Sequence, residues 1–498
     1  MFSNLVGEER KFRNLINGQW CNSKSKEFIE IRSPINQEIV GKVPAMTREE
    51  VDEVIQIAVN AREKWKETPI NERARILYKA ADLLQERIVD LSDILIREIA
   101  KDRKSVESEI NRTADFIRFT ADTSKGIYGE SIKSDNFPGF DKKKLSIVVR
   151  EPVGVVLAIS PFNYPINLAA SKIAPALVAG NTVVLKPATQ GSLCGLYLAK
   201  IFQEAGIPDG VLNTITGKGS EIGDYIVTHP AIDFINFTGS SEVGMRIAKI
   251  TSMVPLLMEL GGKDAAIVLG DADLDLAAKN IVDGAYSYSG QRCTAVKRVL
   301  VEECIADELV EKIKGLVEKL KVGNPNNQDV SIVPLIDEKA ADFVWDIIED
   351  ARNKGAHLIV GGKREKNIIY PTLFDYVTTD MRLAWDEPFG PVLPIIRVKD
   401  KDEAIRIANQ SQYGLQSSVF TNNLDNAFYV ADKLEVGAVQ INNKTERGPD
   451  HFPFLGVKSS GIGVQGIKYS IEAMTRIKGV ILNLKKKKVR LYLTFLLF

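Results

Sequence analysis

The residue best suited to covalent chemistry is Cys293, in the segment Tyr288-Ser-Gly-Gln-Arg-Cys-Thr-Ala295. Gly290 and the small polar residues nearby indicate a turn leading into a helix or strand, where the thiol could be exposed. A thiolate is a strong nucleophile and a good leaving group. A lone cysteine is more often a small core residue, so other segments must decide between the two interpretations.

Five further segments supply that context: Ser160-Pro-Phe-Asn-Tyr-Pro165, Phe237-Thr-Gly-Ser240, Met258-Glu-Leu-Gly-Gly-Lys-Asp264, Glu387-Pro-Phe-Gly-Pro391 and Phe452-Pro-Phe454. Together with the cysteine segment they resemble the aldehyde dehydrogenase superfamily. They cover nearly the whole chain and follow the family's order.

The resemblance implies a mechanism with named roles. Cys293 attacks an aldehyde carbon, the hemithioacetal gives hydride to a nicotinamide, and water activated by Glu259 hydrolyses the thioester. The side-chain amide of Asn163 and the backbone N–H of Cys293 are the implied donors to the developing oxyanion. The alternatives are a cap or solvated carboxylate for Glu259 and a turn-shaping role for Asn163.

The cofactor site is expected in two places. Gly239 and Ser240 form a glycine turn after a strand and lead into a helix whose amino terminus can receive phosphate, although Ser241 stands where the family often has threonine. Many NAD-using relatives carry glutamate at the position of Thr189. Threonine removes the repulsion of a ribose 2′-phosphate, and Lys186 adds a positive charge, so NADP is favoured; otherwise Lys186 covers the sheet edge.

Glu387 resembles the family residue that holds the nicotinamide ribose. Substrate recognition is expected from three arginines, Arg112, Arg292 and Arg447, because their planar guanidinium groups suit a phosphate. Tyr164 and Thr294, which lie next to the catalytic residues in sequence, are expected to contact the substrate as well. Each arginine alone is more often a surface residue. In their segments they resemble the non-phosphorylating glyceraldehyde-3-phosphate dehydrogenases, which implies oxidation of D-glyceraldehyde 3-phosphate to 3-phosphoglycerate.

Two other functions stay open at this point. Another semialdehyde dehydrogenase would use the same arginines for a carboxylate. A catalytically silent binding protein on the same fold is disfavoured by the intact set of Cys293, Glu259 and Asn163.

The elements that must position these residues follow from hydrophobic periodicity. Residues 47–100 are helical in pattern, with capping-box spacing between Thr47 and Glu50, and residues 144–159 are β-rich. Strands and helices then alternate over 182–237 and again from 265 to about 392, which predicts two α/β units with parallel strands.

The predicted fold class is therefore α/β, an aldehyde dehydrogenase-like fold in three parts. A Rossmann-like NADP-binding domain is assigned to residues 1–124 and 152–258, and an α/β catalytic domain to 259–450. A small β oligomerisation element is assigned to 125–151 and 466–484. The family resemblance implies that this element assembles the chain into a homotetramer.

Composition excludes several other classes of protein. Lysine plus arginine equal aspartate plus glutamate at 65 each, so no global field favours nucleic acid or an anionic membrane. The four cysteines lack metal-ligand spacing, so no metal is expected, and a reducing, cytoplasmic location fits them. A lysine run and apolar end at 485–498 diverge from the family and are expected to be a strand or frayed tail rather than a membrane-surface anchor.

Overall fold

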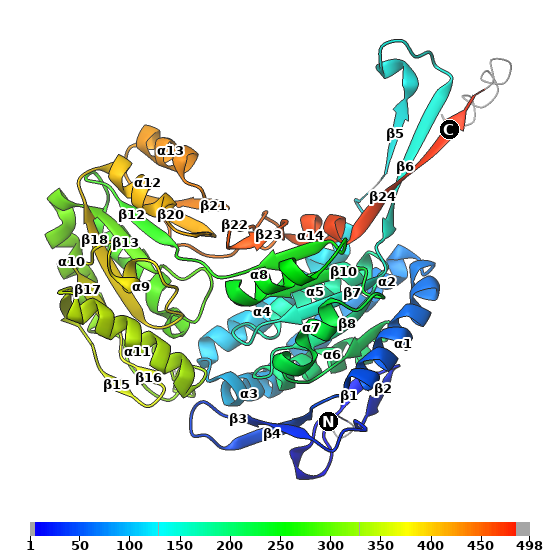
Figure 1. Cartoon of the computed structure of the whole chain (residues 1–498), viewed down its shortest axis with the longest axis horizontal. Coiled ribbons are helices and arrows are strands. Elements are labelled where there is room, and N and C mark those ends of the chain that lie inside the picture. Colours follow the sequence, from blue (N-terminus) through cyan, green and yellow to red (C-terminus); the bar gives the residue numbers. More distant parts are fainter. Residues whose placement is uncertain (1–4, 128, 328, 485–498) are drawn as a thin grey trace.

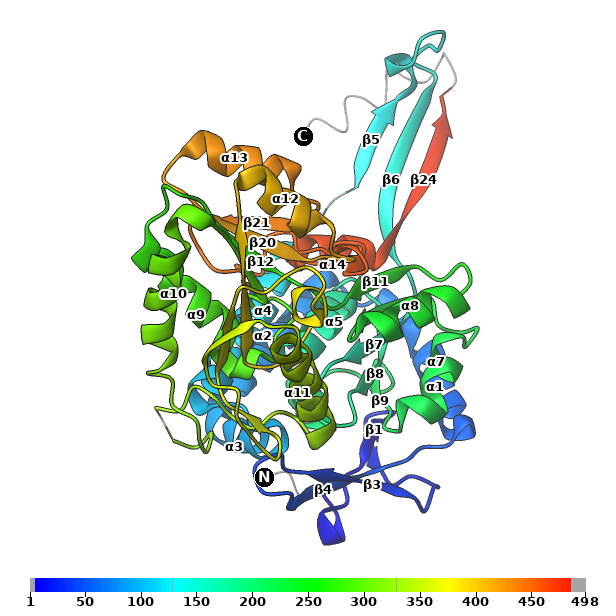
Figure 2. The ribbon, with the colours of Figure 1, turned by 60° about the vertical axis from the view of Figure 1, so that its left-hand side comes forward.

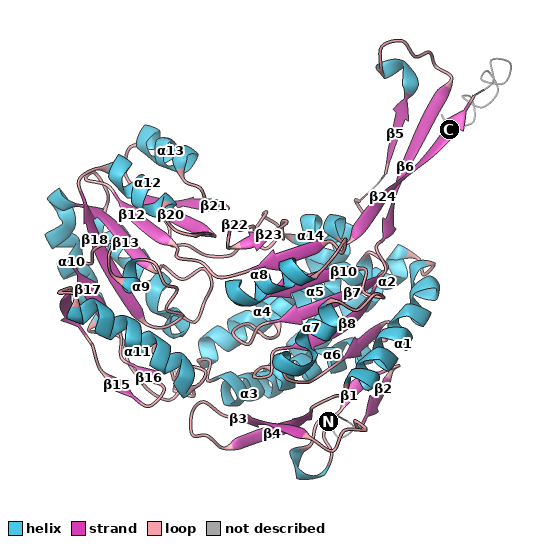
Figure 3. Cartoon of the chain, in the orientation of Figure 1, coloured by secondary structure: helices cyan, strands magenta, loops and turns pink. Residues whose placement is uncertain are grey.

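The computed structural model describes residues 5–127, 129–327 and 329–484. The tail assigned to 485–498 lies outside these residues. In Figures 1 and 3, helices cover the faces of two sheets, and a β arm projects from the body. None of the helices formed by the described residues is long and apolar enough to cross a bilayer.

The expected amino-terminal helical region is confirmed as α1 Arg48–Lys66, α2 Ile70–Glu86 and α3 Ile88–Ile99, followed by α4 Arg103–Ser124. The predicted capping box starts α1: the Glu50 N–H donates to Thr47 Oγ1 at 3.3 Å, and the Thr47 N–H donates to Glu50 Oε2 at 3.0 Å. Before them lie two hairpins, β1 Asn14–Ile16 with β2 Gln19–Cys21 and β3 Phe28–Arg32 with β4 Ile39–Pro44.

The first large sheet has the strand order β23-β11-β10-β7-β8-β9, parallel except for β23. Its strands are β7 Val155–Ser160, β8 Thr182–Pro187, β9 Leu212–Thr214, β10 Phe234–Thr238, β11 Leu256–Glu259 and β23 Gly461–Ile462. Its helices are α5 Asn167–Val178, α6 Ser192–Ala205, α7 Asp224–Val227 and α8 Ser241–Ile250. The predicted parallel α/β alternation is therefore confirmed, although the helical segment between β9 and β10 is a π-helical turn, Gly219–Gly223, followed by the short α7.

The second large sheet has the order β14-β17-β18-β13-β12-β20-β21 and is parallel except for β14. Its strands are β12 Ala265–Val268, β13 Arg298–Glu302, β14 His357–Val360, β17 Thr372–Asp375, β18 Val392–Val398, β20 Gln416–Phe420 and β21 Ala438–Ile441. Its helices are α9 Leu274–Tyr286, α10 Glu303–Val317, α11 Glu338–Asn353, α12 Lys401–Asn409 and α13 Leu424–Lys433. Two small pairs accompany it, β15 Arg364–Glu365 with β16 Ile368–Ile369 and β19 Tyr413–Gly414 with β22 Val457–Lys458.

The projecting arm is an antiparallel sheet of β5 Glu130–Lys133, β6 Lys144–Pro152 and β24 Thr475–Asn483 (Figure 2). The long pairing of β24 with β6 runs from Thr475 opposite Pro152 to Asn483 opposite Lys144. One expectation needs correction: residues 466–484 are not a strand throughout. Their first part is helix α14, Ile467–Ala473, which packs against α4 and α5 in the body because Ile467 and Ile471 are buried there.

The chain passes between the two large sheets at residues 260–264, directly after β11, and returns to the first sheet through β23. The boundary proposed at 258/259 therefore falls one residue before the end of β11. The division into domains stays a prediction. Separate apolar clusters on the two sides of this crossing indicate that each sheet has its own core.

Candidate active site

Residues from four neighbouring strands meet at one edge of the first sheet. Asn163 follows β7, Lys186 lies near the end of β8, Ser240 follows β10, and Glu259 is the last residue of β11. Because these strands are parallel, their carboxyl ends share one edge, which is where open α/β sheets bind ligands. Cys293 approaches from the second sheet, on the loop before β13.

The predicted turn around Cys293 is confirmed. The Arg292 N–H donates to the Gly290 carbonyl at 2.8 Å, and the Ala295 N–H donates to the Arg292 carbonyl at 3.2 Å. Gly290 has φ 71°, and a Cβ there would lie 2.4 Å from the Gly390 carbonyl oxygen, so this position requires glycine.

The thiol is less exposed than the turn alone suggests, because Cys293 is a half-buried residue. Burial raises the pKa of the Cys293 thiol to about 11; the charge of Lys297 opposes that rise, and Glu259 adds to it. Burial therefore disfavours the thiolate in this arrangement, and the charge of Lys297 partly offsets that effect.

Lys297 is a site residue that sequence reasoning missed. Its Nζ donates to the Cys293 carbonyl and lies 3.2 Å from Glu387 Oε1. The Gly262 N–H also donates to Glu387 Oε1 at 3.2 Å, which fixes this carboxylate beside the crossing segment. Residues 287–297, between α9 and β13, carry Cys293 and are called the nucleophile loop. Lys297 therefore links this loop to Glu387, the residue expected to hold the ribose.

Asn163 lies against the nucleophile loop, as its expected role requires. Its Nδ2 donates to the Gln291 carbonyl at 2.9 Å, two residues before Cys293. Among the described residues, the Cys293 backbone N–H has no hydrogen-bond partner. An oxyanion near Cys293 would therefore find a free backbone donor and an amide already held close to it.

Glu259 is buried, with 3% of its side chain exposed, and its Oε2 accepts a bond of 2.8 Å from Arg447 Nη1. Burial raises the pKa of the Glu259 carboxyl, and the charges of Arg447 and Lys172 counter that rise. Burial also lowers the pKa of Lys172 to about 7, and its Nζ donates to Thr238 Oγ1 at 2.7 Å.

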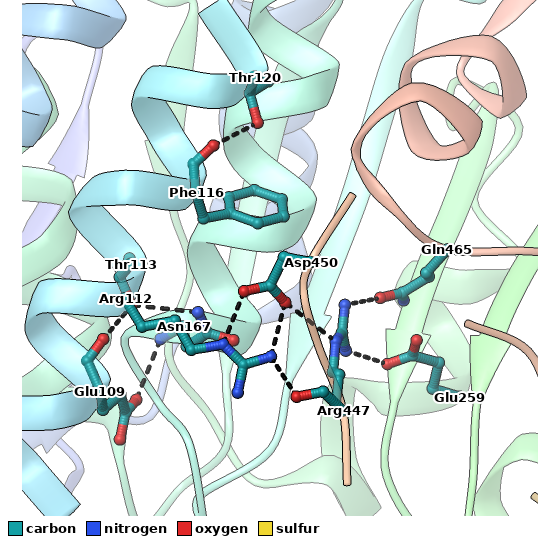
Figure 4. A network of polar contacts seen from close by, with 10 residues as sticks. All are labelled: Glu109, Arg112, Thr113, Phe116, Thr120, Asn167, Glu259, Arg447, Asp450 and Gln465. Carbon is teal, nitrogen blue, oxygen red and sulfur yellow. Dashed lines mark hydrogen bonds and ion pairs between the residues drawn. The ribbon is translucent and has the colours of Figure 1, made fainter. Parts of the chain in front are cut away.

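Arg447 and Arg112 share one carboxylate, Asp450 (Figure 4). Arg112 binds it with two bonds, Nε to Oδ2 at 2.6 Å and Nη2 to Oδ1 at 2.8 Å, and also donates to the Arg447 carbonyl at 2.7 Å. Arg447 Nη2 donates to Gln465 Oε1 at 2.8 Å. The structure thus brings two of the three predicted arginines together. Asp450 and Gln465, which orient them, were missed because they are remote in sequence from Arg112.

Arg292, the third predicted arginine, does not contact the Asp450 carboxylate that Arg112 and Arg447 share. Arg292 Nη2 donates to the Gly284 carbonyl of α9. Thr294 is buried beside it, and its carbonyl accepts a bond of 3.0 Å from Thr445 Oγ1. Tyr164 and Arg112 line a cavity of about 420 Å³ that also includes Glu109 and Lys444. This cavity is lined by two of the predicted substrate residues, Arg112 and Tyr164.

Lys186 and Thr189 lie at the turn from β8 to α6. Lys186 is 6% exposed, and among the described residues its Nζ has no hydrogen-bond or ion-pair partner. Burial lowers its pKa to about 8. A lysine amine that makes no such bond is suited to an incoming anion. Thr189 is half-buried beside it.

The amino terminus of α6 is closed by Glu98, another residue that the sequence did not single out. Its carboxylate accepts bonds from the N–H groups of Gly191, Leu193 and Cys194 at 2.9, 2.9 and 2.8 Å. These three N–H groups are therefore already bonded and do not offer donors to a phosphate. Glu98 instead shapes the loop that carries Thr189.

Gly239 and Ser240 lie at the start of α8, as predicted. Ser240 Oγ caps the helix by accepting from the Val243 N–H at 3.3 Å, and the Gly239 N–H donates to the Glu259 carbonyl at 3.2 Å. A Cβ on Gly239 would lie 2.5 Å from the Phe237 ring, so a side chain at this position would displace that ring.

A family model described as the aldehyde dehydrogenase family matches residues 20–480. The chain belongs to the aldehyde dehydrogenase family. This membership confirms the resemblance drawn from the sequence and the α/β fold expected from it.

This aldehyde dehydrogenase is similar to several proteins of one name. It is 58% identical to the NADP-dependent glyceraldehyde-3-phosphate dehydrogenase of Streptococcus equinus, over 96% of this chain and 100% of that protein. It is 49% identical to the protein of the same name from Arabidopsis thaliana, over 96% of each. The crystal structure of the Bacillus halodurans C-125 protein of that name, complexed with NADP, superimposes with a TM-score of 0.94 at 56% identity and covers 95% of this chain and 99% of that one.

Proposed function

We propose that this aldehyde dehydrogenase oxidises D-glyceraldehyde 3-phosphate to 3-phosphoglycerate with NADP, through a thioester on Cys293 that water hydrolyses. Full-length similarity at 58% identity to an enzyme of that substrate and cofactor is the observation that carries the proposal. The site supports it by placing a thiol, a buried carboxylate and two arginines at the crossing between the sheets.

The chain's own residues provide the acylation chemistry. The half-buried Cys293 thiol gives its proton to solvent water, Sγ forms a bond to the aldehyde carbon, and the carbonyl oxygen becomes an oxyanion. Lys297 favours the thiolate because its charge lowers the pKa of the thiol. Asn163 and the backbone N–H of Cys293 stabilise the oxyanion.

The residues present fit NADP. Lys186 is a buried residue whose Nζ makes no hydrogen bond within the described part of the chain, which suits the 2′-phosphate. Thr189 adds no charge that would repel that phosphate, and Glu387 is held in place for a ribose hydroxyl. The Ser240-capped start of α8 suits the pyrophosphate, whereas Glu98 closes the start of α6. When bound, NADP supplies the hydride acceptor.

Hydrolysis of the thioester needs a base, and Glu259 is placed for that task at the end of β11. Its raised pKa makes it a better proton acceptor than an exposed carboxylate, and the charge of Arg447 opposes that rise in pKa. The proton of the attacking water moves to Glu259, the C–S bond breaks, and Cys293 leaves as the thiolate.

The second candidate is a semialdehyde dehydrogenase that uses Arg112 for a carboxylate. A substrate panel separates the two, with glyceraldehyde 3-phosphate, unphosphorylated glyceraldehyde and succinic semialdehyde oxidised under the same conditions. We expect kcat/KM to be highest for the phosphorylated aldehyde. The Cys293→Ala variant should oxidise none of them and still bind NADP, because only the covalent step needs sulfur.

We also propose that the arm of β5, β6 and β24 joins subunits into a homotetramer in the cytoplasm. The arm exposes Ile477, Val480 and Ile481 at 67%, 45% and 61%, an apolar surface typical of an interface. The free cysteines suit a reducing compartment. Sedimentation of Ile481→Glu beside the unchanged chain tests the assembly, and cell fractionation tests the location.

A further inference from the structure

A buried lysine contacts both segments that carry the proposed acylation chemistry. Lys101 follows α3, and its Nζ donates to Glu109 Oε2 at 2.6 Å and to the Asn163 carbonyl at 3.0 Å. The side chains of Lys101 and Glu109 are both 0% exposed. This ion pair lies outside the set of residues assigned so far.

Glu109 extends the contact along the same turn. Its Oε1 accepts bonds from the N–H groups of Ile166 and Asn167, each at 3.0 Å, where α5 begins. Figure 4 shows Glu109 on α4 beside Asn167. The pair therefore binds the backbone of the turn that carries Asn163 at three points.

The nucleophile loop meets the same ammonium group. Lys101 Nζ lies 3.3 Å from the centroid of the Tyr164 ring and 4.9 Å from that of Tyr288, and the two rings pack edge to face. The Tyr288 hydroxyl donates to the Ile99 carbonyl at 3.2 Å. Thus the end of α3 contacts both Tyr164, next to Asn163, and Tyr288, on the loop of Cys293.

Asn163 is consequently held from two directions. Lys101 binds its backbone carbonyl, and its side-chain amide donates to the Gln291 carbonyl of the nucleophile loop. A fully buried ion pair is weak evidence for stability, because desolvation offsets much of the attraction. What this pair does provide is a fixed geometry between two segments that are far apart in sequence.

We propose that the buried Lys101–Glu109 pair is a positioning device that holds the oxyanion donor Asn163 in register with the Cys293 loop. This positioning role rests on the proposed roles of Asn163 and Cys293. The pair acts on acylation and not on NADP binding, since Lys186, Thr189 and Glu387 make no bond to it. Lys101 and Glu109 touch no reacting atom and are positioning residues.

The test compares two variants of the same residue. Lys101→Met removes the donor and Lys101→Gln keeps one, while both remove the charge. In single-turnover experiments we expect Lys101→Met to slow NADPH formation about tenfold to a hundredfold, because small misplacements at a reacting centre have effects of that size. Lys101→Gln should retain most of the rate, and the Kd for NADP should stay within about twofold in both.

A double-mutant cycle identifies the route of the effect. In an Asn163→Ala background, Lys101→Met should slow NADPH formation by less than about twofold further, because the donor that it positions is gone. An equal loss in both backgrounds would overturn the proposal, and so would equal rates for Lys101→Met and Lys101→Gln. If Lys101→Met does not fold, Lys101→Met/Glu109→Gln replaces it in the same cycle, since it leaves no lone buried carboxylate.

These measurements use whichever aldehyde the unchanged chain oxidises fastest. A chain that prefers an unphosphorylated aldehyde would contradict the proposed substrate but leave the comparison intact. Failure of the positioning proposal appears only in the ratios between variants.

Discussion

Arg447 Nη1 donates to Glu259 Oε2 at 2.8 Å, which joins a proposed phosphate ligand to the proposed base. The second carboxylate oxygen, Glu259 Oε1, is buried with no hydrogen-bond partner in the described part of the chain. An incoming phosphate would compete with Glu259 for the same guanidinium. Substituting Arg447 should therefore affect hydrolysis as well as recognition, whereas Arg112 makes no bond to Glu259.

Substitution of Arg112 and substitution of Arg447 should have different effects on the oxidation of an unphosphorylated aldehyde. Loss of a charge-assisted bond costs roughly 1.5–3 kcal/mol, so Arg112→Ala and Arg447→Ala should each lower kcat/KM for glyceraldehyde 3-phosphate by about tenfold to a hundredfold. Arg112→Ala should leave kcat for glyceraldehyde nearly unchanged, while Arg447→Ala should lower it too. Steady-state kinetics with both aldehydes measure this, and an equal loss on both from Arg112→Ala would make Arg112 structural.

The same contact predicts a pH effect. The charge of Arg447 lowers the pKa of Glu259, so Arg447→Met should raise it. A carboxylate must be ionised to act as a base, and therefore the rising limb of kcat against pH should move to higher pH. The profile is measured with unphosphorylated glyceraldehyde, so that loss of phosphate binding does not interfere. A limb that stays in place, or moves to lower pH, argues against Glu259 as the titrating base.

Glu259→Gln separates the two halves of the reaction. Hydride transfer precedes water activation, so the first turnover should still release a burst of NADPH while steady-state turnover collapses. Stopped-flow absorbance measures both phases. Loss of the burst itself would show that Glu259 acts earlier, for example on the Cys293 thiol.

Thr189→Glu should shift the enzyme from NADP toward NAD. A carboxylate at this position would face the 2′-phosphate beside Lys186 and repel it by several kcal/mol at most. The ratio of kcat/KM for the two cofactors measures the shift, with Thr189→Gln as the uncharged control. An unchanged ratio for Thr189→Glu would mean that Thr189 does not face that phosphate.

Local patterns were enough to predict much of the fold. The capping box of Thr47 and Glu50 marks the start of α1, and hydrophobic patterns located strands and helices of both sheets. The elements of the second sheet after about residue 392, which include α12, β20, α13 and β21, were not predicted. The β assignment of 466–484 was wrong for its first part, which forms helix α14. The apolar residues of that helix pack against the body and do not pair with a strand.

Residues that act through distant partners could not be predicted. Lys101 and Lys297 are charged yet buried, and their carbonyl and carboxylate partners become neighbours only in the folded chain. Arg112 and Asp450 are 338 residues apart in sequence. The turn at Cys293 was predictable from Gly290, but the raised pKa of its thiol depends on packing from both sheets.

The central claim is that the thioester is hydrolysed and not phosphorolysed. The most direct measurement is the oxidation of D-glyceraldehyde 3-phosphate with NADP in phosphate-free buffer, with the product identified by mass spectrometry. We predict 3-phosphoglycerate and NADPH in equal amounts, with no increase in rate when inorganic phosphate is added. Formation of an acyl phosphate, or NADPH production that requires added phosphate, would contradict the account.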